Sequence, residues 1–135
     1  MGNIPLGEED GPWGKEVLID LSGCNNDLMN DIGKLEEFLP KLVKKINMVA
    51  VGKPIVKRFG SGKLEGISGF QFIETSNITV HLDEFENRAM IDIFSCKDFN
   101  SNVAVEFCKE FFKAEKAMYK NEYRGGYEDR NWKVL

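Results

Sequence analysis

The stretch that decides the fold is IETSNITVHLDEF, residues 73–85. Its second half alternates between apolar and polar side chains, as a half-buried strand does. One face holds Ile78, Val80 and Leu82, and the other holds Asn77, Thr79, His81 and Asp83. The alternation predicts a strand over 77–83 whose polar face carries the only histidine of the 135-residue chain.

Two neighbouring strands are predicted over 68–74 and 88–96, joined to the first by short links. The strand over 88–96 is largely apolar on both faces: Ile91 and Ile93 alternate with Met90, Asp92, Phe94 and Cys96. A strand of this kind is typically covered on both sides. We therefore expect helices on one face of the sheet and the sheet of a second copy of the chain on the other.

The flanking sequence supplies the other elements. Before the three central strands, we expect a strand over 16–22, a helix from Asn25 or Asn26 to Asn47, a strand over 48–59 and a loop over 60–66. After them, we expect a helix from Asn100 or Ser101 and a segment over 116–123 that either extends this helix or forms a last strand. This order predicts an α+β two-layer sandwich, in which an antiparallel sheet carries two helices on one face, and dimerisation would give four layers, αββα.

Several residues within these elements have positional meaning. Pro40 lies inside the first helical pattern and is expected to kink or divide the helix. Gly52 and Pro54 predict an edge strand or a bulge over 48–59. The second helix is expected to bury a stripe of Val103, Phe107 and Phe111, flanked by Ala104 and Cys108.

Composition excludes several classes of protein. A formal net charge of −4 argues against a nucleic-acid-binding surface. No apolar run approaches the ~20 residues that cross a bilayer, and the first residues do not form a secretory signal. The three cysteines, Cys24, Cys96 and Cys108, lack the spacing of a zinc site. We expect a reduced, cytoplasmic protein without a bound metal and without membrane or nucleic-acid partners.

The central segment resembles the prokaryotic S-adenosylmethionine decarboxylases, small self-processing pyruvoyl enzymes of polyamine and spermidine biosynthesis. The resemblance rests on Ser68-Gly69, on SNITVH (76–81), on IDIFSC (91–96) and on Gly23-Cys24. Four positions match in type and spacing, namely Ser68, Ser76, His81 and Cys96. The resemblance covers residues 15–125, which leaves an N-terminal arm (1–14) and a C-terminal tail (126–135).

The resemblance implies a chemistry for these residues. The hydroxyl of Ser76 attacks the carbonyl of Thr75, and β-elimination from the resulting ester cuts the chain and leaves a pyruvoyl group derived from Ser76. His81 is implied as the elimination base, a role that suits a neutral imidazole, and Ser68 as a residue that helps to hold either His81 or the ester. The pyruvoyl ketone forms a Schiff base with the substrate amine and takes up the electrons released as CO₂ departs. Cys96 is implied as the acid that protonates the product.

The sequence departs from the family at two places. Thr75 stands where the family usually has glutamate. After the histidine, the family run Thr-Trp-Pro-Glu, which supplies a stacking Trp and a ribose-binding Glu, is replaced by Leu82, Asp83, Glu84 and Phe85. A one-residue shift would let Glu84 and Phe85 exchange these duties, and Phe59 resembles the family's other adenine-stacking residue. The implied substrate-binding residues are therefore Phe59, Asp83, Glu84 and Phe85.

Three functions remain open from the sequence. The first is decarboxylation of S-adenosylmethionine. The second uses the same pyruvoyl machinery on a basic amino acid, L-ornithine or L-arginine, whose distal cation would pair with Asp83 and Glu84. The third is an unprocessed, non-catalytic homologue that acts as a binding or partner subunit. Taken singly, Ser76 is also compatible with an ordinary turn, His81 with a satisfied sheet histidine and Cys96 with a small core residue.

Overall fold

The computed structural model describes residues 5–9, 11–126 and 132–135. Its elements are β1 (Gly14–Ser22), α1 (Asn26–Met29), α2 (Ile32–Lys45), β2 (Ala50–Phe59), the short 3₁₀ helix η1 (Gly62–Leu64), β3 (Gly66–Ile73), β4 (Ser76–Asp83), β5 (Arg88–Ser95), α3 (Ser101–Phe111) and β6 (Lys116–Arg124). The predicted α+β order is confirmed. The segment over 116–123 is a strand and does not extend the second helix.

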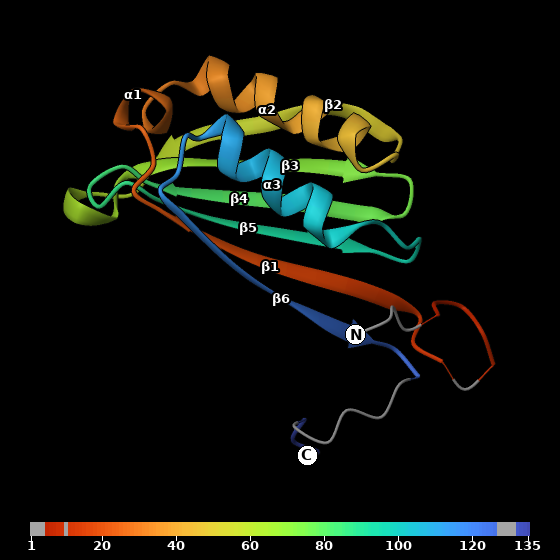
Figure 1. The fold of residues 1–135 in the computed structure, drawn as a ribbon. Coiled ribbons are helices and arrows are strands. Elements are labelled where there is room, and N and C mark those ends of the chain that lie inside the picture. The colour runs from red at the N-terminus through yellow and green to blue at the C-terminus, as the bar shows by residue number, and fades with distance from the viewer. Residues whose placement is uncertain (1–4, 10, 127–131) are drawn as a thin grey trace.

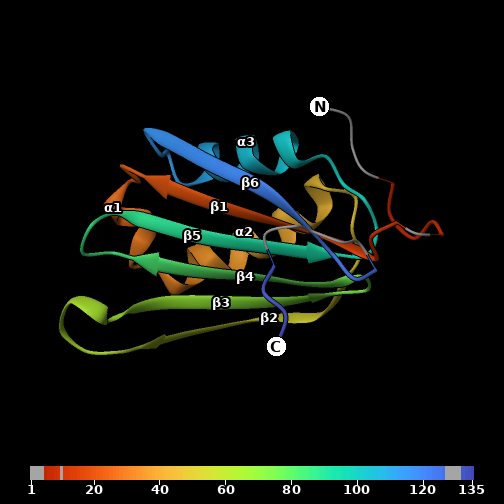
Figure 2. The same cartoon turned by 90° about the horizontal axis from the view of Figure 1, so that it is seen from below.

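The strands form a single antiparallel sheet in the order β2-β3-β4-β5-β1-β6. Helices α2 and α3 lie side by side over one face, and the other face carries no helix of the described chain (Figures 1 and 2). Ile78, Val80 and Leu82 are buried on the helical face, as the alternation predicts, whereas His81 is exposed on the opposite face. We call the face without helices the outer face.

The first helical segment is divided at a different place from the one predicted. Pro40 lies inside α2 without ending it, and the break falls at Asn30–Asp31. Asn25 caps the start of α1 by accepting from Asp27 N, and Asp31 sets the break by capping α2, since it accepts from Lys34 N. The N-cap at Asp31 therefore has a larger effect on the helix boundaries than the missing N–H of Pro40.

The second helix buries a stripe that is rotated from the predicted one. Ala104, Val105 and Cys108 are buried in α3, whereas Phe107 and Phe111 are only partly buried. These two rings pack sideways against Phe38 of α2, with centroids 5.8 and 5.0 Å from its ring. The large aromatic residues therefore fill the contact between the helices, and the small residues let α3 approach the sheet.

The edges of the sheet follow the sequence signals. β2 is an edge strand with a register shift between Val51 and Ile55, as Gly52 and Pro54 predict. The end of the N-terminal arm is fixed to β6, since Trp13 N donates to the carbonyl of Arg124 and its ring lies 5.9 Å from that of Phe94. Residues 1–4 and 10 of the predicted arm and 127–131 of the predicted tail lie outside the described residues. No helix of the described chain is long and apolar enough to cross a membrane.

Candidate active site

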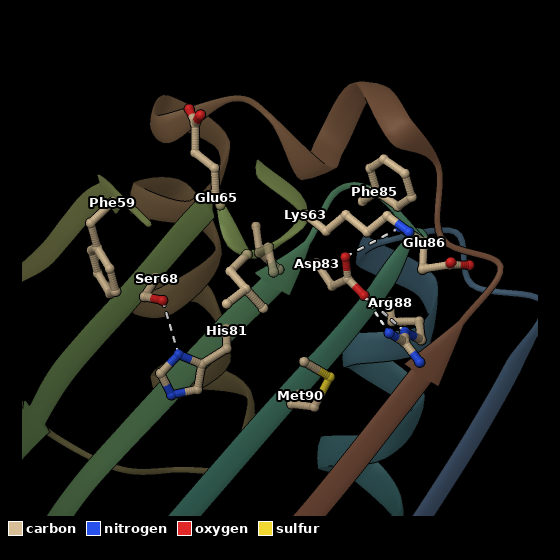
Figure 3. A pocket seen from close by; sticks show the side chains of 13 residues that line it. Phe59, Lys63, Glu65, Ser68, His81, Asp83, Phe85, Glu86, Arg88 and Met90 are labelled. Carbon is tan, nitrogen blue, oxygen red and sulfur yellow. Dashed lines mark hydrogen bonds and ion pairs between the residues drawn. The ribbon is translucent and has the colours of Figure 1, made fainter. Parts of the chain in front are cut away.

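Ser68 and His81 form a pair on the outer face. They lie directly opposite each other in the register of β3 and β4, and Ser68 Oγ is 2.9 Å from His81 Nδ1 (Figure 3). In the tautomer in which Nδ1 donates this hydrogen bond, Nε2 is unprotonated and can accept a proton. The pair therefore presents an oriented base on an exposed surface.

A cavity of about 440 Å³ opens beside this pair. Its wall combines aromatic, charged and thioether groups from β2, η1, β3, β4 and β5. The lining includes Phe59, Lys63, Ser68, His81, Asp83, Phe85, Arg88 and Met90. In Figure 3, Phe59 and Phe85 stand on opposite sides of the cavity, and the Lys63 ammonium lies 5.3 Å from the centre of the Phe85 ring. Two aromatic walls of this kind suit a flat ring system.

The two acids predicted to bind substrate are both paired with arginines of the chain. Asp83 accepts from Arg88 Nε at 2.9 Å and Nη2 at 2.6 Å. Glu84 accepts from Arg58 at 2.5 Å and does not line the cavity. The two carboxylates that would pair with the distal cation of ornithine or arginine are thus already paired with arginines of the chain itself.

Electrostatics around Asp83 favour its ionised form. Burial by itself raises the pKa of this carboxyl, but the hydrogen bonds from Arg88 and from Glu86 N outweigh burial and lower the pKa below its ordinary value. The pair therefore stabilises the fold above the unfolded-state pKa of about 3.9, and this contribution is lost as the pH falls through the lower, folded-state pKa.

We expect Asp83→Asn to lower the free energy of unfolding at pH 7 by up to about 1 kcal/mol, the range of exposed ion pairs. At pH 2.5 the difference from wild type should be smaller, since this pH lies below the unfolded-state pKa of about 3.9 and the contribution is lost as the pH falls towards the lower folded-state pKa. Urea unfolding at both pH values measures this. Asp20→Asn, at an exposed position of β1, is the control, and an equal loss at both pH values would contradict the prediction.

The predicted cleavage site is the tight turn between β3 and β4. Glu74 and Thr75 form this turn, and Ser76, the first residue of β4, has a φ of 150°. Residues other than glycine rarely adopt such a positive φ, and it stores backbone strain. The carbonyl oxygen of Thr75 accepts a hydrogen bond of 2.9 Å from Cys96 N. The backbone is thus strained at Ser76, next to a Thr75 carbonyl that a backbone donor already polarises.

The three cysteines are free thiols in different surroundings. Cys24 and Cys108 are buried, and burial raises the pKa of Cys24 to about 11 and that of Cys108 further still. Cys96 is only partly buried and follows β5 beside Thr75. Cys96 is therefore the one accessible thiol of the three.

A buried cation supports the segment that follows Cys96. Lys15 is fully buried, and its ammonium lies 2.9 Å from Asp98 Oδ1, 2.5 Å from the carbonyl oxygen of Phe99 and 4.3 Å from the centre of the Phe99 ring. It shares its face of β1 with the buried Val17. The sequence signal for this contact is a lysine at a position of the strand whose alternate neighbours, Val17, Ile19 and Leu21, are apolar.

We expect Lys15→Met to lower the free energy of unfolding by about 2 kcal/mol, because the buried carbonyl of Phe99 loses its donor while the apolar volume is retained. Asp98, which is half exposed, turns to water and adds little. Chemical denaturation measures the change. Lys53→Met, at an exposed position of β2, is the control, and equal stability of both variants would contradict this role of Lys15.

The four residues matched by spacing fall into two separate groups. Ser76 and Cys96 lie at one end of the sheet, and Ser68 and His81 lie towards the other end with the cavity. Ser76 and His81 are five residues apart on one strand, which corresponds to about 16 Å at ~3.3 Å per residue. The hydroxyl and the imidazole of one chain are therefore too far apart to act on the same bond.

Sequence reasoning missed several residues of the cavity wall. Arg88 and Met90 share the outer face of β5 beside His81, as the register His81↔Met90 shows. The alternation that placed His81 on this face would have placed them there too, given the pairing of β4 with β5. Lys63 comes from the loop over 60–66, where no periodic pattern gives a position.

Comparison with known proteins agrees with this geometry. The sequence profile described as S-adenosylmethionine decarboxylase matches residues 15–125. The chain is 34% identical over 113 residues to an S-adenosylmethionine decarboxylase proenzyme of Clostridium botulinum (strain Loch Maree / Type A3), which covers 83% of this chain and 94% of the relative. It is 28% identical over 113 residues to the proenzyme of Pelotomaculum thermopropionicum, with 83% and 86% covered.

The fold is also that of a solved structure. The adenosylmethionine decarboxylase of Aquifex aeolicus VF5 superposes with a TM-score of 0.73 at 21% sequence identity, over 90% of this chain and 98% of that one. The sequence profile matches residues 15–125, which include both long helices and all but the first residue of the sheet, and the chain therefore belongs to the S-adenosylmethionine decarboxylase family.

Proposed function

We propose that the chain cuts itself between Thr75 and Ser76 and that Ser76 becomes the pyruvoyl group with which it decarboxylates S-adenosylmethionine. The family activity is that of a self-processing carboxy-lyase of polyamine biosynthesis with a serine-derived pyruvoyl group. The observation that carries the assignment to Ser76 is its φ of 150° beside a Thr75 carbonyl held by Cys96 N at 2.9 Å. The backbone strain at Ser76 and the Cys96 N–H donor thus lie on the two sides of the Thr75–Ser76 peptide bond.

The first step is an acyl shift within the turn. Ser76 Oγ attacks the carbonyl carbon of Thr75, its proton passes to the amide nitrogen, and the C–N bond breaks as an ester forms. Negative charge develops on the Thr75 oxygen during the attack, where the Cys96 N–H already points. A preorganised donor at a developing oxyanion lowers the barrier, and the shift releases the backbone strain at Ser76.

The second step is a β-elimination, which needs a base. Removal of the α-proton of residue 76 expels the Thr75 carboxylate, and hydrolysis of the dehydroalanine left behind releases ammonia and forms the pyruvoyl end. His81, held by Ser68, fits this base. Because it lies about 16 Å along the strand from Ser76, we infer that the partner's His81 performs the elimination.

A face-to-face homodimer would bring the two groups together. The outer face exposes apolar side chains that are each 50–59% accessible, namely Val51, Ile55, Phe59, Phe72 and Met118. A two-fold axis that crosses the strands reverses their direction in the partner. The Ser76–Cys96 end of one chain then faces the cavity of the other. Light scattering at micromolar concentration tests the dimer, and a monomer would contradict it.

The cavity supplies the binding groups of the completed site. The pyruvoyl group itself supplies a ketone that accepts the electrons released with CO₂. Phe59 and Phe85 would flank the adenine ring, and the Asp83–Arg88 pair lies on the cavity wall beside them. Cys96, the accessible thiol next to residue 76, would return a proton to the product. Glu84 is paired with Arg58 and is not part of the cavity lining, so this proposal gives it no direct contact with the substrate.

One experiment tests the function against its alternatives. Intact mass of the purified protein should show fragments 1–75 and 76–135, the second lighter by one ammonia than its sequence, with CO₂ released from S-adenosylmethionine. A persistent whole chain would favour a non-catalytic homologue. Turnover of ornithine or arginine without S-adenosylmethionine would favour the basic-amino-acid alternative, which the occupied carboxylates of Asp83 and Glu84 speak against.

A further inference from the structure

One buried hydroxyl connects the two sides of the proposed cleavage site. Ser95, at the end of β5, is fully buried and lies opposite Ser76 in the sheet register. Its Oγ is 2.8 Å from Thr75 Oγ1, 2.7 Å from the carbonyl oxygen of Lys97 and 2.9 Å from Lys97 N. A single side-chain oxygen thus contacts both the residue whose carbonyl is attacked and the turn that carries Cys96.

Counting donors and acceptors fixes the direction of each bond. A serine hydroxyl has one proton to donate and two lone pairs that accept. The Lys97 carbonyl can only accept, so the Ser95 proton goes there. Lys97 N can only donate, which occupies one lone pair of Ser95. The Thr75 hydroxyl has one proton and two acceptors in reach, Ser95 Oγ at 2.8 Å and the Met48 sulfur at 3.4 Å. Since a thioether sulfur is a weak acceptor, the Thr75 proton goes to the free lone pair of Ser95.

We infer that Ser95 is a positioning residue for self-cleavage, which sets the alignment of the Thr75 carbonyl with the Cys96 N–H. On one side its hydroxyl binds the Thr75 side chain and so fixes the orientation of the turn that carries the Thr75 carbonyl. On the other side it closes residues 95–97 into a ring that fixes the Cys96 amide. The inference rests on the proposed cleavage between Thr75 and Ser76 and adds to it the group that builds the oxyanion site.

The test follows cleavage of newly synthesised chains. Wild type and variants are made by cell-free translation, and the whole chain and its two fragments are followed by intact mass. Ser95→Ala removes the hydroxyl and should slow cleavage about tenfold, the rate equivalent of one buried hydrogen bond. Thr75→Val should slow it similarly, whereas Thr75→Ser and Ser95→Thr, which keep a hydroxyl, should cleave within about threefold of wild type.

A matched control separates positioning from general destabilisation. Ser101 is also a buried serine, and its hydroxyl donates to Asn121 Oδ1 at 2.8 Å between α3 and β6. Ser101→Ala loses a comparable hydrogen bond far from Thr75 in the sequence and should cleave at the wild-type rate. The double variant Thr75→Val/Ser95→Ala should be no slower than the slower single variant, since both changes break one shared contact.

A chemical trap shows which step is affected. Hydroxylamine cleaves the ester formed by the acyl shift and leaves a hydroxamate on Thr75, but it does not cleave the amide. In a His81→Ala background, where elimination is slowed by about 10²–10⁴-fold, the ester accumulates and the hydroxylamine-sensitive fraction reports the acyl shift. Adding Ser95→Ala to this background should reduce the rate at which that fraction appears by about tenfold. If Ser95→Ala slowed only the elimination, this rate would be unchanged, and the inference would be overturned.

The outcomes distinguish the inference from the function on which it rests. Wild-type chain that never cleaves overturns the proposed function. If the wild type cleaves and Ser95→Ala cleaves at the same rate, the inference alone is overturned. The same holds if Ser101→Ala slows cleavage as much as Ser95→Ala does, or if the slowing in the double variant equals the product of the slowings in the two single variants. If Ser95→Ala lacks a cooperative melting transition, the comparison of Thr75→Val with Thr75→Ser decides in its place.

Discussion

Ser76→Ala is expected to leave the chain whole and without activity. A methyl group cannot attack the Thr75 carbonyl, so no ester forms, no elimination follows and no ketone appears at residue 76. Decarboxylation of S-adenosylmethionine should fall by more than about a thousandfold, since enzymes commonly gain at least about 10⁶ over the uncatalysed reaction. Intact mass gives the state of the chain, a carbonyl-reactive hydrazine detects the ketone, and CO₂ release gives the activity.

The control for this variant is the same change outside the site. Ser61→Ala, in the exposed loop before η1, should cleave and turn over as wild type does. Removing the hydroxyl should not harm the fold of Ser76→Ala, because residue 76 would keep its place in the β4 ladder. Cleavage of the Ser76→Ala chain at the bond after Thr75, or activity of the whole chain, would show that another residue carries the reaction.

The sequence predicted the layers and the faces of the fold because strand alternation is a local property. Ile78, Val80 and Leu82 alternate with polar residues, and no distant contact was needed to place them against the helices. Pro40 does not divide the helix, and the break lies at Asn30–Asp31 instead, because Asp31 caps a new helix there and this second cap was not weighed against the proline. The buried stripe of α3 was rotated because Phe107 and Phe111 pack between helices.

The candidate site was predictable in its residues but not in its arrangement. Spacing brought Ser76, His81 and Cys96 together as one set, while an extended strand separates Ser76 from His81 by about 16 Å. Register then decides which residues are neighbours: Ser68 meets His81, and Ser95 meets Ser76. Pairings of this kind depend on which strands lie next to each other, and a single sequence does not give that.

The separation of Ser76 from His81 predicts that two defective chains can repair each other. His81→Ala alone should slow processing by about 10²–10⁴-fold, the usual loss of a general base, and Ser76→Ala alone should not process. In a mixed dimer, one site combines Ser76 of the His81→Ala chain with the partner's His81, and the other site has neither. Co-expression should therefore cleave His81→Ala chains only and restore roughly a quarter of wild-type activity under random pairing of the two chains.

A second mixture serves as the matched control for this repair. Ser76 and Cys96 lie at the same end of one chain, so co-expressed Ser76→Ala and Cys96→Ala chains give dimers with a processable site that lacks its proton donor. That mixture should cleave Cys96→Ala chains yet stay far below the activity of the first mixture. Intact mass identifies which chain is cut in each case, because the two variants differ in mass. If mixed dimers form but His81→Ala chains remain whole, each chain uses its own histidine, and the strand would have to bend far from the extended form to bring it there.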